Sequence, residues 1–285
     1  MAEPYVPVYL NGEIVTADQA KISVFDRGFM RGDGLFETMR SYGGNLFRLD
    51  DHLARLDHGL EVLQYSMRSA DLNIRAAAIE TLRASAIPNA RVRVQITRGV
   101  GSTEFTSCVD TEPTVIVTIH PIADGEHAPL NVIVSSIRRD QLSPLSGIKT
   151  INYIPSLMAR MEAERAGADD ALLLNYAGLV AEGCASNVFL VKNGELITPD
   201  LASGALPGII RRTVLEIANQ LGLPAVESPV ELGELKSADE VFMTSSVREV
   251  ASVDMIDGAK VGQGTYEVAE LLKREYRLRA EGVGS

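Results

Sequence analysis

Three residues with side chains suited to carbonyl chemistry follow one another in the middle of the chain. Lys149 lies in SGIKTINYI, Tyr153 comes four residues later, and Glu182 lies in AEGCASNVF. The stretch around Lys149 is weakly charged and mostly apolar, so partial desolvation there would favour the neutral amine, which condenses with aldehydes. A phenol and a carboxylate on neighbouring elements could hold and polarise a pyridine-ring aldehyde.

Each of these residues also has a structural interpretation. A lysine in a loop is usually a solvated charge, and a tyrosine is often a core or interface residue. Glu182 follows an apolar strand, and a carboxylate rarely lies in such a place without a cationic partner. A protonated pyridine nitrogen would be one such partner.

Arg55 is a candidate for binding an anion. It lies one helical turn from His52, which places both side chains on one face of a leucine-striped helix. Its guanidinium could clamp a phosphate, or it could form a surface ion pair with Asp51 or Asp57.

Two further stretches could complete a phosphate site. LPGIIRR predicts a turn that leads into a helix, where the amides of Ile209 and Ile210 and the helix dipole would favour an anion. TSSVRE adds hydroxyls at Ser245 and Ser246. Many helix starts bind nothing, and TSSVRE could equally be an ordinary turn.

The elements that must position these residues are strands interspersed with helices. A hairpin is predicted around Asn11-Gly12, strands at LFETMRSY, RVRVQITRG and PTVIVTIHPI, and helices at 50–64 and about 72–86. FDRGFMRGDG is predicted to be a glycine-punctuated loop. Later come the strand NVIVSSIRR, the strand pair GLVAEGCASNVFLV/GELITP, a helix after LPG and a last helix at about 266–280. Hairpins outnumber strand–helix–strand units, so the predicted class is α+β, or mixed α/β.

The length of 285 residues predicts two lobes rather than one. The polar stretch HPIADGEHAP is the best candidate for a linker. We therefore expect a small N-terminal α+β domain at 1–120, an interdomain linker at 121–130 and a larger domain at 131–285.

Composition excludes several classes of function. A formal charge of −11 argues against a nucleic-acid or anionic-membrane surface. Cys108 and Cys184 have no metal-ligand spacing, and with four histidines no metal site is predicted; both cysteines are expected to be reduced structural thiols. The apolar runs fall well short of the roughly 20 residues of a membrane span. No signal peptide is recognisable at the N-terminus, so we expect a cytoplasmic protein.

Taken together, the motifs resemble those of the class IV aminotransferases, the pyridoxal-phosphate enzymes of fold type IV. FDRGFMRGDGLFETMR is similar to their N-terminal signature, DDHLARL to the helix with the phosphate-binding arginine, and GIKTINY to the segment with the cofactor lysine. RVRVQITRG, AEGCASNVF, LPGIIRR and VFMTSSVREV match further segments in family order. The resemblance covers almost the whole chain and implies a two-domain fold like that of D-amino-acid aminotransferase.

The resemblance also implies roles for individual residues. Lys149 would form the internal aldimine with pyridoxal 5′-phosphate and shuttle a proton, and Glu182 would pair with the ring nitrogen. Tyr153 would bond the ring hydroxyl; Arg55, the amides of Ile209 and Ile210, and Ser246 would hold the phosphate, with Ser245 beside the substrate carboxylate. Candidates on the substrate side are Phe36, Arg31, Arg40, Arg93 and Arg98, although Arg40, Arg93 and Arg98 could instead form interface or sheet-edge ion pairs. A homodimer with shared active sites is implied.

The family contains several activities, and the motifs most resemble the compact branched-chain aminotransferases. Arg31 stands where those enzymes usually have tyrosine, and TSS stands where Thr-Gly-Thr or Ser-Gly-Thr is more usual. ITRGVGSTEF lacks the Arg-x-His of the best-known D-amino-acid enzymes, and Tyr153 argues against the lyases.

The expected activity is therefore transfer of an amino group from a branched-chain or other hydrophobic amino acid to a 2-oxo acid, with ping-pong kinetics. The alternatives are a D-amino-acid aminotransferase, an aminodeoxychorismate lyase that releases pyruvate by elimination, and a non-catalytic protein that keeps the fold.

Overall fold

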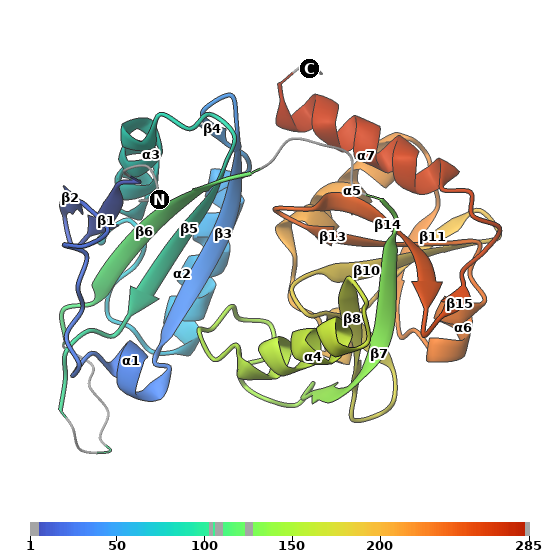
Figure 1. The fold of residues 1–285 in the computed structure, drawn as a ribbon, viewed down its shortest axis with the longest axis horizontal. Helices are drawn as coiled ribbons and strands as arrows, with labels where there is room; N and C mark the ends of the chain where they lie inside the picture. The colour runs from blue at the N-terminus through green and yellow to red at the C-terminus, as the bar shows by residue number, and fades with distance from the viewer. Residues whose placement is uncertain (1–5, 103–104, 106–110, 123–127, 283–285) are drawn as a thin grey trace. The chain divides into compact units, whose positions relative to one another are not determined.

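The computed structural model describes residues 6–102, 105, 111–122 and 128–282 and confirms a mixed helix and sheet architecture (Figure 1). Two compact units are present. The first comprises Met1–Asp124 and Ile148–Asn152, and the second Gly125–Gly147 and Tyr153–Ser285. The predicted linker covers the first passage between the units, and its residues 123–127 lie outside the described residues. The prediction assigned 148–152 to the second domain, whereas these residues pack with the first unit.

The first unit contains a six-stranded antiparallel sheet within its described residues, in the order β2-β1-β6-β5-β3-β4. Its elements are β1 (Val8–Leu10), β2 (Glu13–Val15), α1 (Arg27–Arg31), β3 (Gly34–Tyr42), β4 (Asn45–Leu46), α2 (Leu49–Val62), α3 (Ile74–Ser85), β5 (Ala90–Thr97) and β6 (Thr114–Pro121).

One face of this sheet packs against α2 and α3 to form the core of the first unit (Figure 1). The period-two pattern of RVRVQITRG is confirmed, because Val92, Val94 and Ile96 are fully buried while Arg91 is exposed. The leucine stripe of α2 faces the same core. The other face of β3 and β5 carries Phe36 and Arg93, together with further polar side chains.

The prediction of a loop at FDRGFMRGDG is wrong over five residues, which form α1. The Asp26 side chain caps this helix by accepting a hydrogen bond from the Gly28 amide, and it also accepts from the hydroxyls of Thr97 and Thr114. These hydroxyls come from β5 and β6, which are distant in the sequence. The sequence around α1 alone therefore could not predict the contacts that hold the helix.

The second unit contains a nine-stranded sheet within its described residues, in the order β12-β11-β10-β13-β14-β7-β8-β9, with β15 paired to β14. Its elements are β7 (Leu130–Arg139), α4 (Ile154–Arg165), β8 (Asp170–Asn175), β9 (Val180–Gly183), β10 (Asn187–Lys192), β11 (Glu195–Pro199), the 3₁₀ turn η1 (Leu201–Ser203), α5 (Ile209–Gln220), β12 (Ala225–Ser228), α6 (Leu232–Lys236), β13 (Glu240–Ser245), β14 (Glu249–Ile256), β15 (Ala259–Lys260) and α7 (Glu267–Ala280).

The predicted strand GLVAEGCASNVFLV is interrupted after Gly183. The Gly183 amide donates to the Ser186 carbonyl across 2.7 Å, and this turn separates β9 from β10. A Cβ at Gly183 would overlap with the side-chain ends of Met243 and Ser186, so a larger residue here would displace both side chains. The break leaves Glu182 at the end of a short buried strand.

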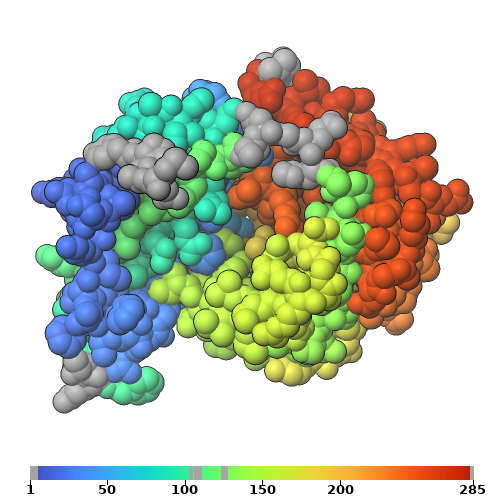
Figure 2. Space-filling view, in the orientation of Figure 1, coloured from blue at the N-terminus to red at the C-terminus, as the bar shows by residue number. Residues whose placement is uncertain are grey.

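The helices of the second unit cover its sheet in separate places. α4 packs against β7 and β8 through the small residues Ser156, Ala159 and Ala163, and α5 and α7 pack against each other and β13. The opposite side of α4 exposes Ile154, Leu157, Met158 and Met161. Figure 2 shows this helix, in yellow-green, at the molecular surface. No helix in the described part of the chain has the length and apolarity to cross a bilayer.

Candidate active site

Lys149 is placed by backbone hydrogen bonds to the start of β3. The Phe36 amide donates to the Lys149 carbonyl across 2.9 Å, and the Ile151 amide donates to the Gly34 carbonyl across 3.1 Å. A Cβ at Gly34 would overlap with the Ile96 carbonyl and touch Ile151. The glycine in this signature therefore makes room for the segment that carries the lysine.

The same pairing determines which way the Lys149 side chain faces. Residues directly opposite one another in an antiparallel bridge share a face, so Lys149 and Phe36 lie on the face of the sheet away from α2 and α3. The Lys149 amine is half-buried and lies 4.5 Å from the centroid of the Phe36 ring. Arg93 from β5 places its guanidinium carbon 3.9 Å from that centroid. The structure thus brings two predicted residues, Lys149 and Arg93, to the ring of a third, Phe36.

Arg55 lies on the core side of β3 and pairs with Glu37. Its Nε and Nη2 donate to the two oxygens of the Glu37 carboxylate across 2.8 and 2.7 Å, and His52 Nδ1 lies 2.7 Å from one of these oxygens. The prediction that His52 and Arg55 share a helix face is confirmed, since both contact one carboxylate.

The environment of this cluster controls its charges. Burial alone would raise the pKa of Glu37, but Arg55 and His52 outweigh burial and hold that pKa below its ordinary value. Burial lowers the pKa of His52, against the opposing effect of Glu37. Glu37 is therefore an ionised carboxylate that orients Arg55, and sequence analysis missed it. The available signal was a glutamate at a core-facing position of the period-two strand.

The remaining arginines have different surroundings. The Arg98 guanidinium is occupied by the Asp33 carboxylate, with Nε at 2.9 Å, and by the Leu63 carbonyl, which agrees with the structural alternative for this residue. Arg40 lies 4.9 Å from the Tyr42 ring centroid. Arg31 ends α1.

In the second unit, Glu182 is held at both oxygens. Oε2 accepts a hydrogen bond from the Leu206 amide across 2.8 Å, and Oε1 lies 3.1 Å from Arg139 Nε, which also donates to the Gly204 carbonyl. A cationic partner was expected for this carboxylate, and the chain supplies Arg139. The contact joins the end of β7 to β9, so no local pattern in the sequence indicated it.

Tyr153 lies at the start of α4, where its hydroxyl donates to the Cys184 carbonyl across 3.2 Å. Burial raises the pKa of the Cys184 thiol to about 12, as expected for an unreactive structural thiol. Cys108 lies outside the described residues.

The first turn of α5 presents amides without a side-chain cap. Gly208 is the N-cap residue, and a Cβ there would overlap with the Asn187 amide oxygen. Asn187 also donates from Nδ2 to the Leu206 carbonyl across 2.9 Å. Glu182 and Asn187 together fix the turn that presents the amides of Ile209 and Ile210.

Ser245 and Ser246 lie at the turn between β13 and β14. The Arg248 amide donates to the Ser245 hydroxyl across 3.1 Å, and Ser246 is half-buried within the turn. Glu249 closes the turn with a φ of +60°, which is unfavourable for a residue with a side chain, and its carboxylate pairs with Arg277 across 2.8 Å. The ion pair with Arg277 therefore helps to hold Glu249 in this conformation at the end of the serine turn.

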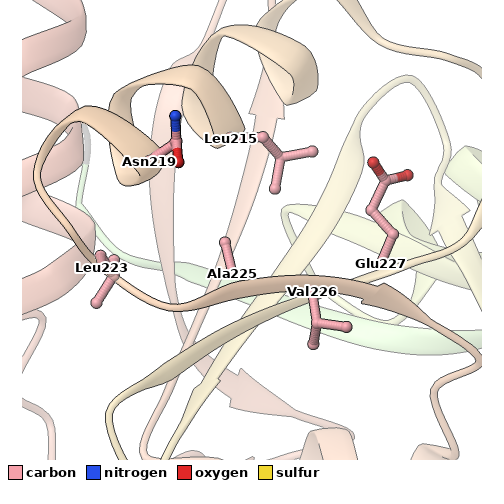
Figure 3. A pocket seen from close by; sticks show the side chains of 6 residues that line it. All are labelled: Leu215, Asn219, Leu223, Ala225, Val226 and Glu227. Carbon is pink, nitrogen blue, oxygen red and sulfur yellow. The ribbon is translucent and has the colours of Figure 1, made fainter.

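A separate hollow of about 410 Å³ lies between α5 and β12. Figure 3 shows its lining: Leu215, Asn219, Leu223, Ala225, Val226 and Glu227. None of the predicted site residues borders it, so it carries no part of their chemistry.

Comparisons with known proteins agree with the resemblance seen in the sequence. A family model described as amino-transferase class IV matches residues 34–256. A Methanocaldococcus jannaschii protein, provisionally named a branched-chain-amino-acid aminotransferase, is 36% identical over 276 residues, covering 95% of each chain. The Bacillus subtilis aminodeoxychorismate lyase is 34% identical over 95% of this chain and 94% of its own. The Bacillus licheniformis D-alanine aminotransferase is 32% identical over 90% of both.

Solved structures show the same fold. The branched-chain aminotransferase of Thermoproteus uzoniensis with norvaline superimposes with a TM-score of 0.91 at 29% identity, covering 99% of this chain and 96% of its own. The branched-chain amino acid aminotransferase of Thermobaculum terrenum in its PLP-form gives 0.88 at 29% identity, covering 98% and 94%.

Proposed function

The chain belongs to the class IV aminotransferases, and from this premise we propose that it is a pyridoxal-phosphate-dependent transaminase for branched-chain or other hydrophobic amino acids. The acceptor is a 2-oxo acid such as 2-oxoglutarate or pyruvate. The observation that carries the proposal is the placement of Lys149, whose amine is held beside Phe36 by backbone bonds to β3.

The residues present fit pyridoxal phosphate. The uncapped first turn of α5 begins at a glycine with no room for a side chain, and such a start suits a phosphate group. Glu182 is a carboxylate in a largely apolar strand, as a pyridine nitrogen requires. The relative from Thermobaculum terrenum is described in its PLP-form.

Each residue then has a defined task. When bound, pyridoxal phosphate supplies an aldehyde that takes up the amino group and a ring that stores the electrons released at the substrate Cα. Lys149 Nζ holds and moves the Cα proton, and Glu182 keeps a proton on the ring nitrogen. In the second unit the amides of Ile209 and Ile210 are donors for a phosphate, and in the first unit Glu37 and His52 orient Arg55 as an anion-binding group.

We expect ping-pong kinetics, because the amino group must leave the first substrate before the second can receive it. Arg93 beside Phe36 suits the carboxylate of an acidic acceptor such as 2-oxoglutarate.

The test is a panel of L- and D-amino acids with 2-oxoglutarate or pyruvate. Amine transfer from L-leucine, L-isoleucine and L-valine supports the proposal. Faster transfer from D-alanine would replace it with D-amino-acid aminotransferase activity. Inertness towards all amino acids, with pyruvate released from aminodeoxychorismate, would replace it with lyase activity, which the 34% identical relative keeps open.

A further inference from the structure

Thr244 carries a buried hydroxyl that the proposed function has not used. The residue is 1% exposed, and within the described parts of the chain its Oγ1 atom has no hydrogen-bond partner. Other buried threonines of the second unit are satisfied: Thr198 donates to the Val188 carbonyl across 2.8 Å and Thr213 to the Ile209 carbonyl across 2.9 Å. Because buried polar groups nearly always have a partner, Thr244 is a place where a ligand atom is expected.

The sheet register places this hydroxyl beside the start of α5. Thr244 of β13 is directly opposite Asn187 of β10. Opposite residues of an antiparallel pair share a face, with Cβ atoms about 5 Å apart. The Asn187 amide contacts Leu206 and fills the space next to Gly208. Thr244 therefore faces the turn that leads into α5.

The neighbouring element is the N-terminus of α5, whose first-turn amides have no side-chain cap. α5 is 12 residues long. The amides there point out of the helix, and the positive end of its dipole adds to them. The nearby Glu182 charge is met by Arg139, so it does not oppose an anion at this place. A buried hydroxyl beside these amides adds a further hydrogen-bond donor for phosphate oxygens.

We propose that the Thr244 hydroxyl binds the same phosphate monoester as the first-turn amides of α5. The sequence indicated Ser245 and Ser246 as hydroxyls of this site, and Ser245 also accepts a bond from the Arg248 amide within its own turn. Thr244 adds a donor from the body of the strand. The inference rests on the proposed function, because the phosphate monoester is that of pyridoxal phosphate.

The experiment compares pyridoxal 5′-phosphate with pyridoxal, which lacks the phosphate. Dissociation constants of both are measured by equilibrium dialysis for the full-length wild type, Thr244→Val, Thr244→Ser and Thr198→Val. Thr244→Val is expected to weaken binding of pyridoxal 5′-phosphate by roughly 10- to 100-fold, the usual effect of losing a hydrogen bond to a charged group. Pyridoxal binding should stay unchanged, and Thr244→Ser should restore the preference.

Thr198→Val is the matched control, and thermal unfolding without cofactor provides a second measurement. Valine at 244 removes a hydroxyl that has no protein partner, so the melting temperature should not fall. Valine at 198 breaks an existing hydrogen bond to Val188, so the melting temperature should fall while the preference for the phosphate form stays intact. The two variants therefore have opposite signatures.

Two results would overturn the inference in distinguishable ways. A Thr244→Val variant that keeps the wild-type preference for the phosphate form contradicts the role of Thr244 alone. If the wild type binds pyridoxal 5′-phosphate as weakly as pyridoxal, the proposed cofactor is wrong, and the proposed role of Thr244 is then wrong as well.

Discussion

At the residue scale, the chemistry depends on side chains whose positions are set by backbone contacts. Lys149 is fixed by two strand-like hydrogen bonds to β3 and lies beside Phe36. This arrangement keeps Lys149 half-buried and holds its amine against the Phe36 ring.

We predict that Lys149→Ala abolishes amine transfer while the protein stays folded. No other residue replaces the reacting amine, and the backbone bonds that hold the segment do not involve the side chain. Turnover and circular dichroism test this, with Lys192→Ala as the surface control. An alanine variant that still transfers amino groups would show that the assignment is wrong.

A second prediction concerns Glu182→Gln. The amide can still accept the Leu206 bond, but it loses the charge that favours a protonated ring and that faces Arg139. We expect turnover to fall roughly 100-fold, the usual scale for removing one preorganised electrostatic interaction. Glu227→Gln, which removes the half-exposed partner of Arg211, is the control and should leave turnover unchanged. Equal loss in both variants would point to a structural effect instead.

The sequence predicted candidate ligand-binding residues more readily than the residues that hold those side chains in place. Lys149, Glu182 and Arg55 stand out by their chemistry in apolar surroundings. Glu37 and Arg139 did not, because each acts through a partner on another element. Period-two placement of Glu37 on the core face of β3 was the one usable signal.

At the element scale, the buried cluster of Glu37, His52 and Arg55 ties α2 to β3. Removing one member of a buried ion pair leaves an uncompensated charge, so the cluster is both a positioning device and a structural weakness. The effect of pH on the stability of this cluster follows from the lowered pKa values of Glu37 and His52.

We predict that the protein loses stability as the pH falls from about 7 to about 5. The pKa of His52 in the folded protein lies below the ordinary 6.5. As the pH falls through this range, His52 is therefore protonated in the unfolded chain before it is protonated in the folded protein, which favours unfolding. The lowered pKa of Glu37 acts in the same direction below its ordinary 4.5. The His52 contribution should reach up to about 2 kcal/mol.

Urea unfolding at both pH values measures this effect in wild type, His52→Gln and His58→Gln. The difference between the two pH values should shrink in His52→Gln and persist in His58→Gln, because His58 is exposed. An unchanged difference in His52→Gln would remove the cluster as its source.

A further prediction tests how β3 accommodates the lysine segment. Gly34→Ala places a Cβ against the rigid Ile96 carbonyl and 3.0 Å from Ile151, so the segment must move away from β3. We expect lower activity and lower thermal stability. Gly233→Ala in α6 is the control, since nothing lies near its Cβ; it should be neutral or slightly stabilising. Full activity in Gly34→Ala would mean that this close approach is not required.

Elements with strong periodicity were predictable, and those fixed by distant partners were not. The alternation in β5 and the leucine stripe of α2 indicated both the type of element and its buried face. The short α1 depends on Asp26 contacts to Thr97 and Thr114, and β10, which follows the break after Gly183, pairs with the distant strand β13. Those contacts exist only once the sheets have formed.

At the scale of the whole molecule, the sequence was sufficient to predict the family but not the substrate. Motifs for the shared chemistry are spread along the chain, and a class IV match spans residues 34–256. The relatives at 36, 34 and 32% identity bear the names of three different activities. The predicted substrate-side residues Arg31 and Arg93 have side chains that are compatible with more than one carboxylate.

The last prediction concerns assembly. We expect a homodimer of twice 30.7 kDa, because α4 exposes Ile154, Leu157, Met158 and Met161 on one side. Contiguous exposed apolar side chains of this kind usually mark a protein interface. Sedimentation velocity should give the dimer for wild type and a shift towards 30.7 kDa for Leu157→Glu. Leu221→Glu, at an exposed apolar position after α5, should leave the dimer intact. A monomeric wild type would refute the dimer, whereas a dimeric Leu157→Glu variant would place its interface elsewhere than α4.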